Sequence, residues 1–468
     1  MSGAPRLRGN IGPLQYLALG FGTMIGSAWV ILLGDWLGEA GPGGAVLGFL
    51  AGGVVVMIVG ACYAELTGYI PEAGSEFVYA HRIYGRGLAF VVGWFLILYL
   101  LSVTVFEALA CAWVVETLVP TWHSRVLYSA FGTGISRETL LVGIGGALGI
   151  IALNYRGARV AVVSHAILTS GFLVIVLCIL VALLVNGRSD NWTPLLANVR
   201  GRPWWTGSGA IFAFCAYGLN GFQSIPHAVE ERSPGVSLHR IGVILVSAIG
   251  AAALFYCLVV LAASSIVPWR GLVDAPLPTV AAVAALPYGN VVTVILLIAT
   301  AASLFKAWNG VFMMATRLVV AMARAGFVPG ALARLHPRYE SPALAICAVG
   351  SCTVAGVFFG KGAIEPITDM SAMVLTLTYV LCCVTVLRLR RSGTRGPYRV
   401  PGGEWLIKAG VAGSALMAAC AFLAPFGSAR GGVPLEWRLL GVWGLLGCAV
   451  WFVGLRGLGR LDSRPDPL

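Results

Sequence analysis

Two stretches of glycine and polar residues decide the fold of this chain: Gly22-Thr23-Met24-Ile25-Gly26-Ser27 and Tyr217-Gly218-Leu219-Asn220-Gly221. Each stretch interrupts a long apolar run near its middle. Unwound backbone is tolerated inside a bilayer only where it lines a cavity, so two interruptions at corresponding places predict a binding site. A single glycine is as well explained by close packing of helices, so the prediction depends on the pair.

The composition of the chain places these runs in a membrane. Of its 468 residues, 58% are hydrophobic and 11% are charged, whereas a soluble domain carries about 25% charged residues. A bilayer core of about 30 Å needs roughly 20 apolar residues per helix, and such runs recur along the sequence. They are too long and too uniformly apolar for the strands of a barrel. We therefore expect an all-α polytopic membrane protein.

Twelve transmembrane helices are expected from the apolar runs. Their ranges are 12–38, 43–70, 87–118, 138–154, 157–186, 205–231, 237–267, 289–325, 342–360, 366–390, 404–426 and 433–457. All eleven cysteines fall within these ranges. This placement implies neither a disulfide framework nor a metal site.

The basic residues outside the expected helices indicate how the chain is oriented. Most of those that contribute to the net charge of +12 fall on one side of the membrane, which the positive-inside rule assigns to the cytoplasm. Membrane topology thus explains the charge without binding to nucleic acid. We expect a multi-pass protein of a bacterial cytoplasmic (inner) membrane, with both termini cytoplasmic.

Four motifs carry a resemblance to a known family. They are Met24-Ile25-Gly26-Ser27, Tyr63-Ala64-Glu65-Leu66, Gly221-Phe222-Gln223-Ser224-Ile225-Pro226 and Ala321-Met322-Ala323-Arg324-Ala325-Gly326. Together they resemble the amino acid, polyamine and organocation (APC) transporter superfamily, over about Gly9 to Arg460. The resemblance implies a LeuT-like fold of five-plus-five inverted repeats with helices 1 and 6 discontinuous. It also implies a substrate site between helices 1, 3, 6, 8 and 10, and alternating access.

The same resemblance divides the chain into segments. Residues 1–11 would form a cytoplasmic N-terminus, 12–186 the first inverted repeat (helices 1–5), 205–390 the second (helices 6–10), 404–457 helices 11 and 12, and 458–468 a cytoplasmic tail.

A zwitterionic substrate needs separate partners for its carboxylate and its ammonium. The second half of helix 1 would begin near Ser27, so the Ser27 and Ala28 amides would hold a carboxylate with the help of the helix dipole. Carbonyls freed at the breaks would accept hydrogen bonds from the ammonium. The expected substrate-binding residues are Met24, Ile25, Gly26, Ser27, Ala28, Thr104, Glu107, Tyr217, Asn220 and Phe222.

Two positions depart from the family pattern, which usually shows glycine where this chain has Ala28 and a small or aliphatic residue where it has Trp29. The added methyl group would crowd a carboxylate, which leaves an amine, a polyamine, an amino alcohol or an osmolyte as other substrates. Trp29, Phe222 and Tyr217 would either surround a cation with aromatic faces or only pack the core.

Lys306 is one of three lysines and lies in the middle of an expected helix. Charge at that depth is costly and usually functional. In related transporters a sodium ion, or a lysine in its place, bridges helices 1 and 8. We expect Lys306 to take this part, with its proton replacing sodium and with Asn309 and carbonyls near Gly22 as partners. The alternative is a lysine that reaches the interface or permanently pairs with a carboxylate.

Glu107 is a second charge within an expected helix, and Thr104 lies one turn away on the same face. It would contact a substrate amine or accept a proton, or else serve as a structural partner of Lys306 or of a hydroxyl group. His165 is better explained as a hydrogen-bonded core residue than as a proton relay.

These expectations favour a secondary active transporter of amino acids or related small amines that is coupled to protons and needs no cofactor. The alternatives are a substrate/product antiporter for polyamines or amino alcohols and, less in keeping with the short tail, a nutrient sensor. A membrane enzyme is disfavoured, because no paired metal ligands, nucleophile with base or phosphate-binding loop is present in the sequence. The expected partners are a small-molecule substrate, a proton and the lipid bilayer, and the chain would be a monomer or a homodimer.

Overall fold

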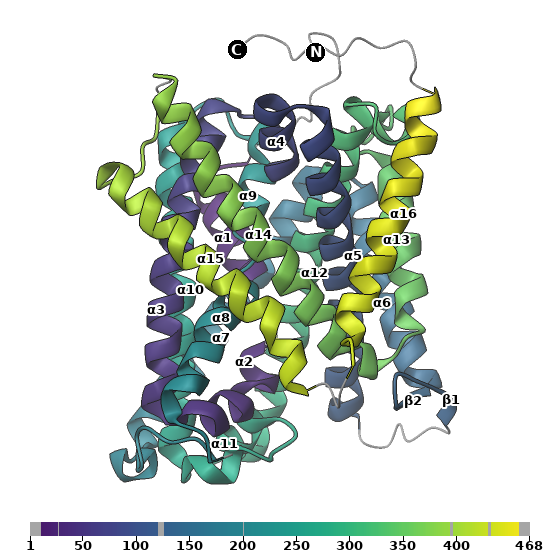
Figure 1. The fold of residues 1–468 in the computed structure, drawn as a ribbon. Helices are drawn as coiled ribbons and strands as arrows, with labels where there is room; N and C mark the ends of the chain where they lie inside the picture. Colours follow the sequence, from purple (N-terminus) through teal and green to yellow (C-terminus); the bar gives the residue numbers. More distant parts are fainter. Residues whose placement is uncertain are drawn as a thin grey trace.

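The computed structural model describes residues 11–26, 28–119, 126–199, 201–393, 396–428 and 432–457 as a bundle of long helices (Figure 1). In chain order the elements are α1 (Pro13–Met24), α2 (Ala28–Ile31), α3 (Leu33–Tyr69), α4 (Glu76–Tyr84), α5 (Arg86–Leu118), β1 (Val126–Ala130), β2 (Thr133–Ser136), α6 (Arg137–Tyr155), α7 (Ala158–Asn186), η1 (Ser189–Trp192), α8 (Trp204–Gly218), α9 (Ser224–His227), η2 (Val229–Glu231), α10 (Leu238–Ile266), η3 (Trp269–Leu272), α11 (Pro278–Ala284), α12 (Gly289–Arg324), η4 (Gly330–Ala333), α13 (Ala343–Val357), η5 (Lys361–Ala363), α14 (Ile364–Arg391), α15 (Gly403–Ser428) and α16 (Leu435–Gly457).

Ten helical segments within the described residues are long and apolar enough to cross a membrane. The chain is therefore a mostly helical, multi-pass membrane protein. Two of the twelve expected helices are not among the ten, because α8 and α13 have only 15 residues each. The α8 helix stops at the expected interruption after Gly218, and α13 begins directly after Pro342.

Both expected interruptions are present as breaks in helices. The first lies between Met24, the last residue of α1, and Ala28, the first residue of α2. The second lies between α8 and α9, where Gly221 has a φ of 111°. The α3 helix also bends, at Gly41 (φ 68°), so that its first turns continue the first expected span and the rest forms the second.

One departure from the expected all-helical chain is a short hairpin in which β1 pairs antiparallel with β2. Its turn contains Phe131 and Gly132, which both have positive φ values, 49° and 73°. This backbone geometry suits the right-handed twist of a tight hairpin. The hairpin connects α5 to α6 and lies beside one end of the bundle (Figure 1).

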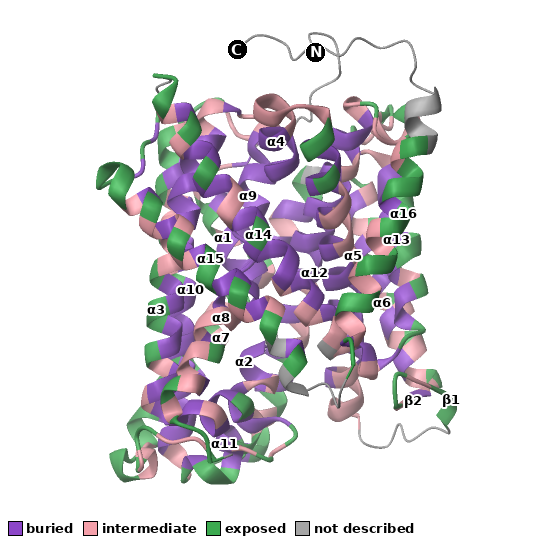
Figure 2. Ribbon diagram, in the orientation of Figure 1, coloured by how far each residue is buried: buried purple, intermediate pink, exposed green. Residues whose placement is uncertain are grey.

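Buried residues concentrate along the middle of the bundle, while exposed residues lie on its outer faces, including those of α15 and α16 (Figure 2). We call the two ends of the bundle the α4 end and the α11 end, after the short helices found there (Figure 1). The broken helices run in opposite senses between these ends, since α2 lies closer to the α11 end than α1 does, and α9 lies closer to the α4 end than α8 does.

Glycines allow the two breaks to meet at the centre. A Cβ atom at Gly221 would lie 2.8 Å from the backbone carbon of Thr23, and one at Gly310 of α12 would overlap the Thr23 hydroxyl group. Any larger residue at either position would push α1 away from its neighbours. The packing thus holds the break after α1 between α8, α9 and α12.

Candidate functional site

Side chains of α12 bond the carbonyl groups that the first break sets free. The Lys306 ammonium donates hydrogen bonds to the Gly22 and Ile25 oxygens, at 2.7 and 2.6 Å. The Ser303 hydroxyl donates to the Ile25 oxygen at 2.8 Å and to the Gly26 oxygen at 3.2 Å. Without such donors, the Gly22 and Ile25 carbonyls would be left buried and unbonded at the end of a helix. Lys306 and Ser303 therefore join α12 to the unwound part of the first span.

Lys306 is fully buried, and its partners differ in part from the expected ones. Gly22 is a partner as expected, and the ammonium also lies 4.6 Å from the centre of the Phe172 ring on α7, within range of a cation–π interaction. Asn309 is not a partner, because its side-chain amide donates to the Ala161 oxygen at 3.0 Å and its oxygen accepts from the Asn154 amide at 2.8 Å. It ties α12 to α6 and α7 instead.

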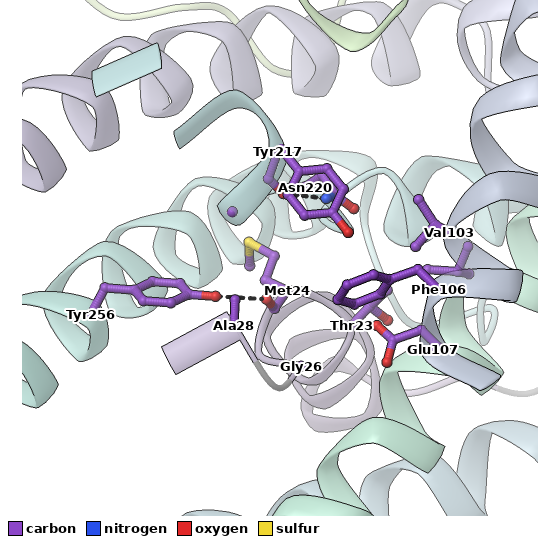
Figure 3. Close-up of a pocket in the computed structure, with 12 residues that line it drawn as sticks. Thr23, Met24, Gly26, Ala28, Val103, Phe106, Glu107, Tyr217, Asn220 and Tyr256 are labelled. Atoms are coloured by element: carbon purple, nitrogen blue, oxygen red, sulfur yellow. Dashed lines mark hydrogen bonds between the residues drawn. The ribbon is translucent and has the colours of Figure 1, made fainter. Parts of the chain in front are cut away.

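A cavity of about 30 Å³ lies beside the break (Figure 3). Its lining consists of Thr23, Met24, Gly26, Ala28, Val103, Phe106, Glu107, Tyr217, Gly218, Asn220, Tyr256 and Val311. Figure 3 shows Tyr256 reaching in from one side, opposite Phe106 and Glu107. A space of this size holds about one or two water molecules, so a substrate enters only if the lining moves.

Six of the expected substrate-binding residues line this cavity: Met24, Gly26, Ala28, Glu107, Tyr217 and Asn220. Ser27 lies outside the described residues. Thr23 and Gly218 belong to the two predicted interruptions, whereas the remaining lining residues, Val103, Phe106, Tyr256 and Val311, were not foreseen. Val103 lies one turn before Glu107 on the same helix face, so helical spacing from Glu107 would have found it, whereas Phe106 directly precedes Glu107 and would not have been found in this way. Tyr256 is far away in the sequence, and no pattern in the sequence links it to the break.

Three expected residues point elsewhere. The Thr104 hydroxyl donates to the Leu101 oxygen at 2.8 Å and contacts the Thr353 hydroxyl at 3.0 Å, which joins α5 to α13. The Phe222 ring packs against tyrosine rings of α3 and α14. Ile25 contributes its carbonyl oxygen to Lys306 but does not line the cavity.

Trp29 does not surround a cation either. Its indole N–H donates to the Gly26 oxygen at 3.0 Å, and its ring packs edge-on against Phe172 and Phe255. Its own carbonyl oxygen accepts a hydrogen bond from the Thr279 hydroxyl of α11 at 2.7 Å. Trp29 therefore braces the start of α2.

Glu107 is the acidic residue of the cavity lining. It is almost completely buried, and its Oε2 atom has no hydrogen-bond partner among the described residues. A Cβ atom at Gly26 would lie 3.2 Å from its Oε1 atom, so glycine leaves room for the carboxyl group against the break. Within the described part of the chain, Glu107 and Lys306 do not form an ion pair, since their charged atoms are not within 4.0 Å of each other.

The second break offers fewer free acceptors than expected. The Asn220 side-chain amide donates to the Tyr217 oxygen, and the Asn220 backbone N–H lies 3.1 Å from the same oxygen. The Asn220 side-chain oxygen accepts a hydrogen bond from the Tyr99 hydroxyl at 2.9 Å. Because the Tyr217 oxygen already accepts two hydrogen bonds, the unpartnered carboxyl oxygen of Glu107 is the better acceptor for an ammonium group.

Comparisons with known proteins agree with this architecture. A family model described as amino acid permease matches residues 11–447. The branched-chain amino acid permease BcaP of Bacillus subtilis is 25% identical, over 99% of this chain and 96% of its own length. Two other proteins of that organism are similar to this chain. The glutamate/serine transporter AimA is 26% identical over 83% of this chain and 72% of its own length, and the serine/threonine exchanger SteT is 25% identical over 87% and 90%. Because the family match covers most of its length, this chain belongs to the amino acid permease family and is a membrane transporter rather than an enzyme.

Proposed function

We propose that this chain is a secondary active transporter of amino acids or related small amines, works by alternating access and couples transport to protons through Lys306. The main support for this proposal is the pair of hydrogen bonds that the Lys306 ammonium donates to the Gly22 and Ile25 oxygens. Loss of the proton would remove the positive charge that holds α12 against the first break. Protonation at this place would thus favour one arrangement of the two helices over another.

A LeuT-like fold of twelve helices supports the proposal. Counting α8 with α9 as one broken helix and adding α13 brings the ten long segments to twelve. The opposite senses of the two broken helices are the arrangement that inverted repeats over 12–186 and 205–390 would produce (Figure 1). Residues 404–457 then add helices 11 and 12 outside the repeats.

The substrate would bind with its carboxylate at the start of α2 and its ammonium at Glu107. Backbone N–H groups at a helix start attract an anion, and the free Oε2 atom of Glu107 suits a cation. Aromatic and aliphatic side chains, among them Phe106, Tyr256 and Val311, make up much of the remaining lining. They favour an amino acid with a small apolar side chain, in keeping with the name of one of the relatives, the branched-chain amino acid permease BcaP.

The chain would lie in a bacterial cytoplasmic membrane with its α4 end inside. Arginines gather at this end, where α14 finishes with Arg388, Arg390 and Arg391, as the positive-inside rule requires. Residues 1–11 and 458–468 would then be cytoplasmic, and the transporter would act as a monomer or a homodimer.

A substrate/product antiporter is the second candidate, because two hydrogen bonds and an aromatic ring hold the Lys306 ammonium in place. A lysine held so firmly could stay charged throughout the cycle. Exchange would then need no proton, and polyamines or amino alcohols would be further substrates.

Uptake into proteoliposomes separates these candidates. We would supply radiolabelled branched-chain amino acids, serine, threonine, putrescine and ethanolamine, with and without an inward proton gradient. The proposal predicts accumulation of amino acids above equilibrium only with the gradient, and loss of that accumulation in Lys306→Met. Lys408→Met, at an exposed position, is the matched control and should behave as wild type. Exchange that ignores the gradient and survives in Lys306→Met would establish the antiporter instead.

A further inference from the structure

A second and larger cavity lies away from the breaks, between α5, α12, α13 and the loop after α12. Its volume is about 160 Å³, and its lining is aliphatic apart from the thiol of Cys352. Leu101 comes from α5, Val319 from α12 and Leu332 from η4. Apolar cavities of about 150 Å³ stay free of water and accept small hydrocarbon groups. The cavity thus suits an alkyl chain and offers nothing to a polar substrate.

This cavity opens toward the outside of the bundle. Ala348 and Cys352, which line it on α13, are both exposed, and Figure 1 shows α13 at the outer edge of the bundle. In a membrane protein of this kind, the outer edge faces the acyl chains of lipids.

The rim of the cavity at the α4 end is basic. Arg334 follows Leu332 by two residues, so their Cα atoms are at most about 7 Å apart, and Arg338 follows in the same loop. Both arginines are exposed. In the described part of the chain, neither takes part in an ion pair within 4.0 Å. Two positive charges without acidic partners therefore stand where the apolar cavity meets the membrane surface.

The loop that carries these arginines is fixed to the joint between α6 and α7. The Ser341 hydroxyl donates to the Tyr155 oxygen at 2.8 Å, and the rings of Tyr155 and His336 lie 5.3 Å apart. This contact brings Arg156, which is also exposed and adjoins Tyr155, close to the loop. Glu340 is the acidic residue within the loop. Because Arg334, Arg338 and Arg156 outnumber it, the net charge around the cavity mouth is positive.

We infer that this cavity and its rim bind one anionic phospholipid, with an acyl chain in the cavity and the phosphate headgroup against Arg334 and Arg338. The aliphatic lining of the cavity suits the acyl chain, and the two exposed arginines suit the negatively charged headgroup. Basic residues at the membrane surface attract anionic headgroups. Because α5 and α12 line both this cavity and the one beside the break, a bound lipid would stiffen the helices that carry Glu107 and Lys306.

Native mass spectrometry of the purified full-length chain tests the inference. The protein would be exposed to phosphatidylglycerol or phosphatidylcholine with identical acyl chains. We expect wild type to retain one phosphatidylglycerol in preference to phosphatidylcholine. The double variant Arg334→Gln/Arg338→Gln should lose this preference, with about a thirtyfold weaker retention of phosphatidylglycerol. Arg240→Gln, which changes an exposed arginine at the start of α10, should retain it.

Two further variants test the cavity. Ala348→Trp would fill it and should abolish retention of either lipid, whereas Leu177→Trp, on the exposed face of α7, should leave retention intact. Substrate uptake by each variant in phosphatidylcholine vesicles shows whether it is folded, and Cys352→Phe replaces Ala348→Trp if that variant fails. Glycerol phosphate, which has the headgroup chemistry without a chain, should not displace the lipid.

Three results would overturn the inference. The first is an unchanged lipid preference in the double arginine variant. The second is unchanged retention in both cavity variants. The third is a dimer of wild-type chains that carries no lipid, which would assign this surface to a second copy of the chain.

Discussion

Lys306 and Glu107 both lie beside the first break and have different tasks in the proposed cycle. Lys306 bonds to carbonyl groups of the unwound backbone, while Glu107 presents a free carboxyl oxygen to the cavity. In the proposed cycle, the proton and the substrate are coupled because these two groups act on the same backbone. The break is that shared element, since the Gly22 oxygen accepts a hydrogen bond from Lys306 and the Glu107 carboxyl group occupies the space beside Gly26.

Substitution of Glu107 by glutamine should weaken substrate binding while leaving the size of the cavity unchanged. A hydrogen bond to a charged group contributes about 1.5–3 kcal/mol, so the KM for uptake should rise about tenfold to a hundredfold. Initial rates of uptake across substrate concentrations measure this. Glu116→Gln, on the same helix but paired with Lys361 at 2.6 Å, is the control. An unchanged KM in Glu107→Gln would remove Glu107 from the substrate site.

Gly310 allows close contact between α12 and the first break, and its replacement tests that packing. In Gly310→Ala the added methyl group would meet the Thr23 side chain. Overpacking of this kind costs about 1–3 kcal/mol, so the thermal midpoint should fall and transport should be lost. Gly441→Ala, where no atom lies within 4 Å of the added carbon, should change neither. Full transport by Gly310→Ala would show that α1 and α12 are free to separate.

At the scale of elements, two ion pairs join η2 to α12 at the α4 end. Arg317 and Glu231 lie 2.5 Å apart and Arg324 and Glu230 3.1 Å apart, all four side chains being nearly buried. Glu230 also accepts a hydrogen bond from the Ala73 backbone N–H at 2.9 Å. These contacts close the bundle on the α4 side of the second break, so an opening toward this end would require η2 to leave α12.

Removal of one partner from the pair of Arg317 with Glu231 should destabilise the closed protein. Arg317→Met leaves a buried carboxylate without its partner, which costs about 3–5 kcal/mol. Thermal unfolding in detergent should show a lower midpoint, and the double variant Arg317→Met/Glu231→Gln should recover most of the loss. Arg188→Met, which breaks an exposed pair with Asp190, should have no measurable effect. If the double variant were no more stable than Arg317→Met, the buried pair would not be the cause.

At the scale of the whole molecule, much of the helical bundle could be predicted from the apolar runs and their interruptions. Glycine and polar residues at Gly22 and Gly218 revealed the breaks, and a charge within a run revealed Lys306. The hairpin of β1 and β2 was not predictable in this way, because it lies between two apolar runs and short strands lack a long apolar signal. The partners of Asn309 and Thr104 were missed because they lie on helices far away in the sequence, and helical spacing reports only near neighbours.

The orientation of the molecule is open to a direct test. With the α4 end inside, a fluorescent protein fused after residue 468 should be fluorescent in cells, because the fused protein would fold in the cytoplasm. A periplasmic phosphatase fused at the same point should be inactive. The opposite pair of results would invert the topology and would place the basic loops outside, against the positive-inside rule.

Proton movement during substrate entry is the measurement that tests the central claim most directly. Proteoliposomes that contain a pH-sensitive dye would receive a transported amino acid in the absence of any initial pH gradient, for wild type, Lys306→Met and Lys408→Met. We predict acidification of the interior with wild type and Lys408→Met, and none with Lys306→Met. Acidification that persists in Lys306→Met, or substrate entry by wild type without any acidification, would contradict the assignment of Lys306 as the proton-coupling group.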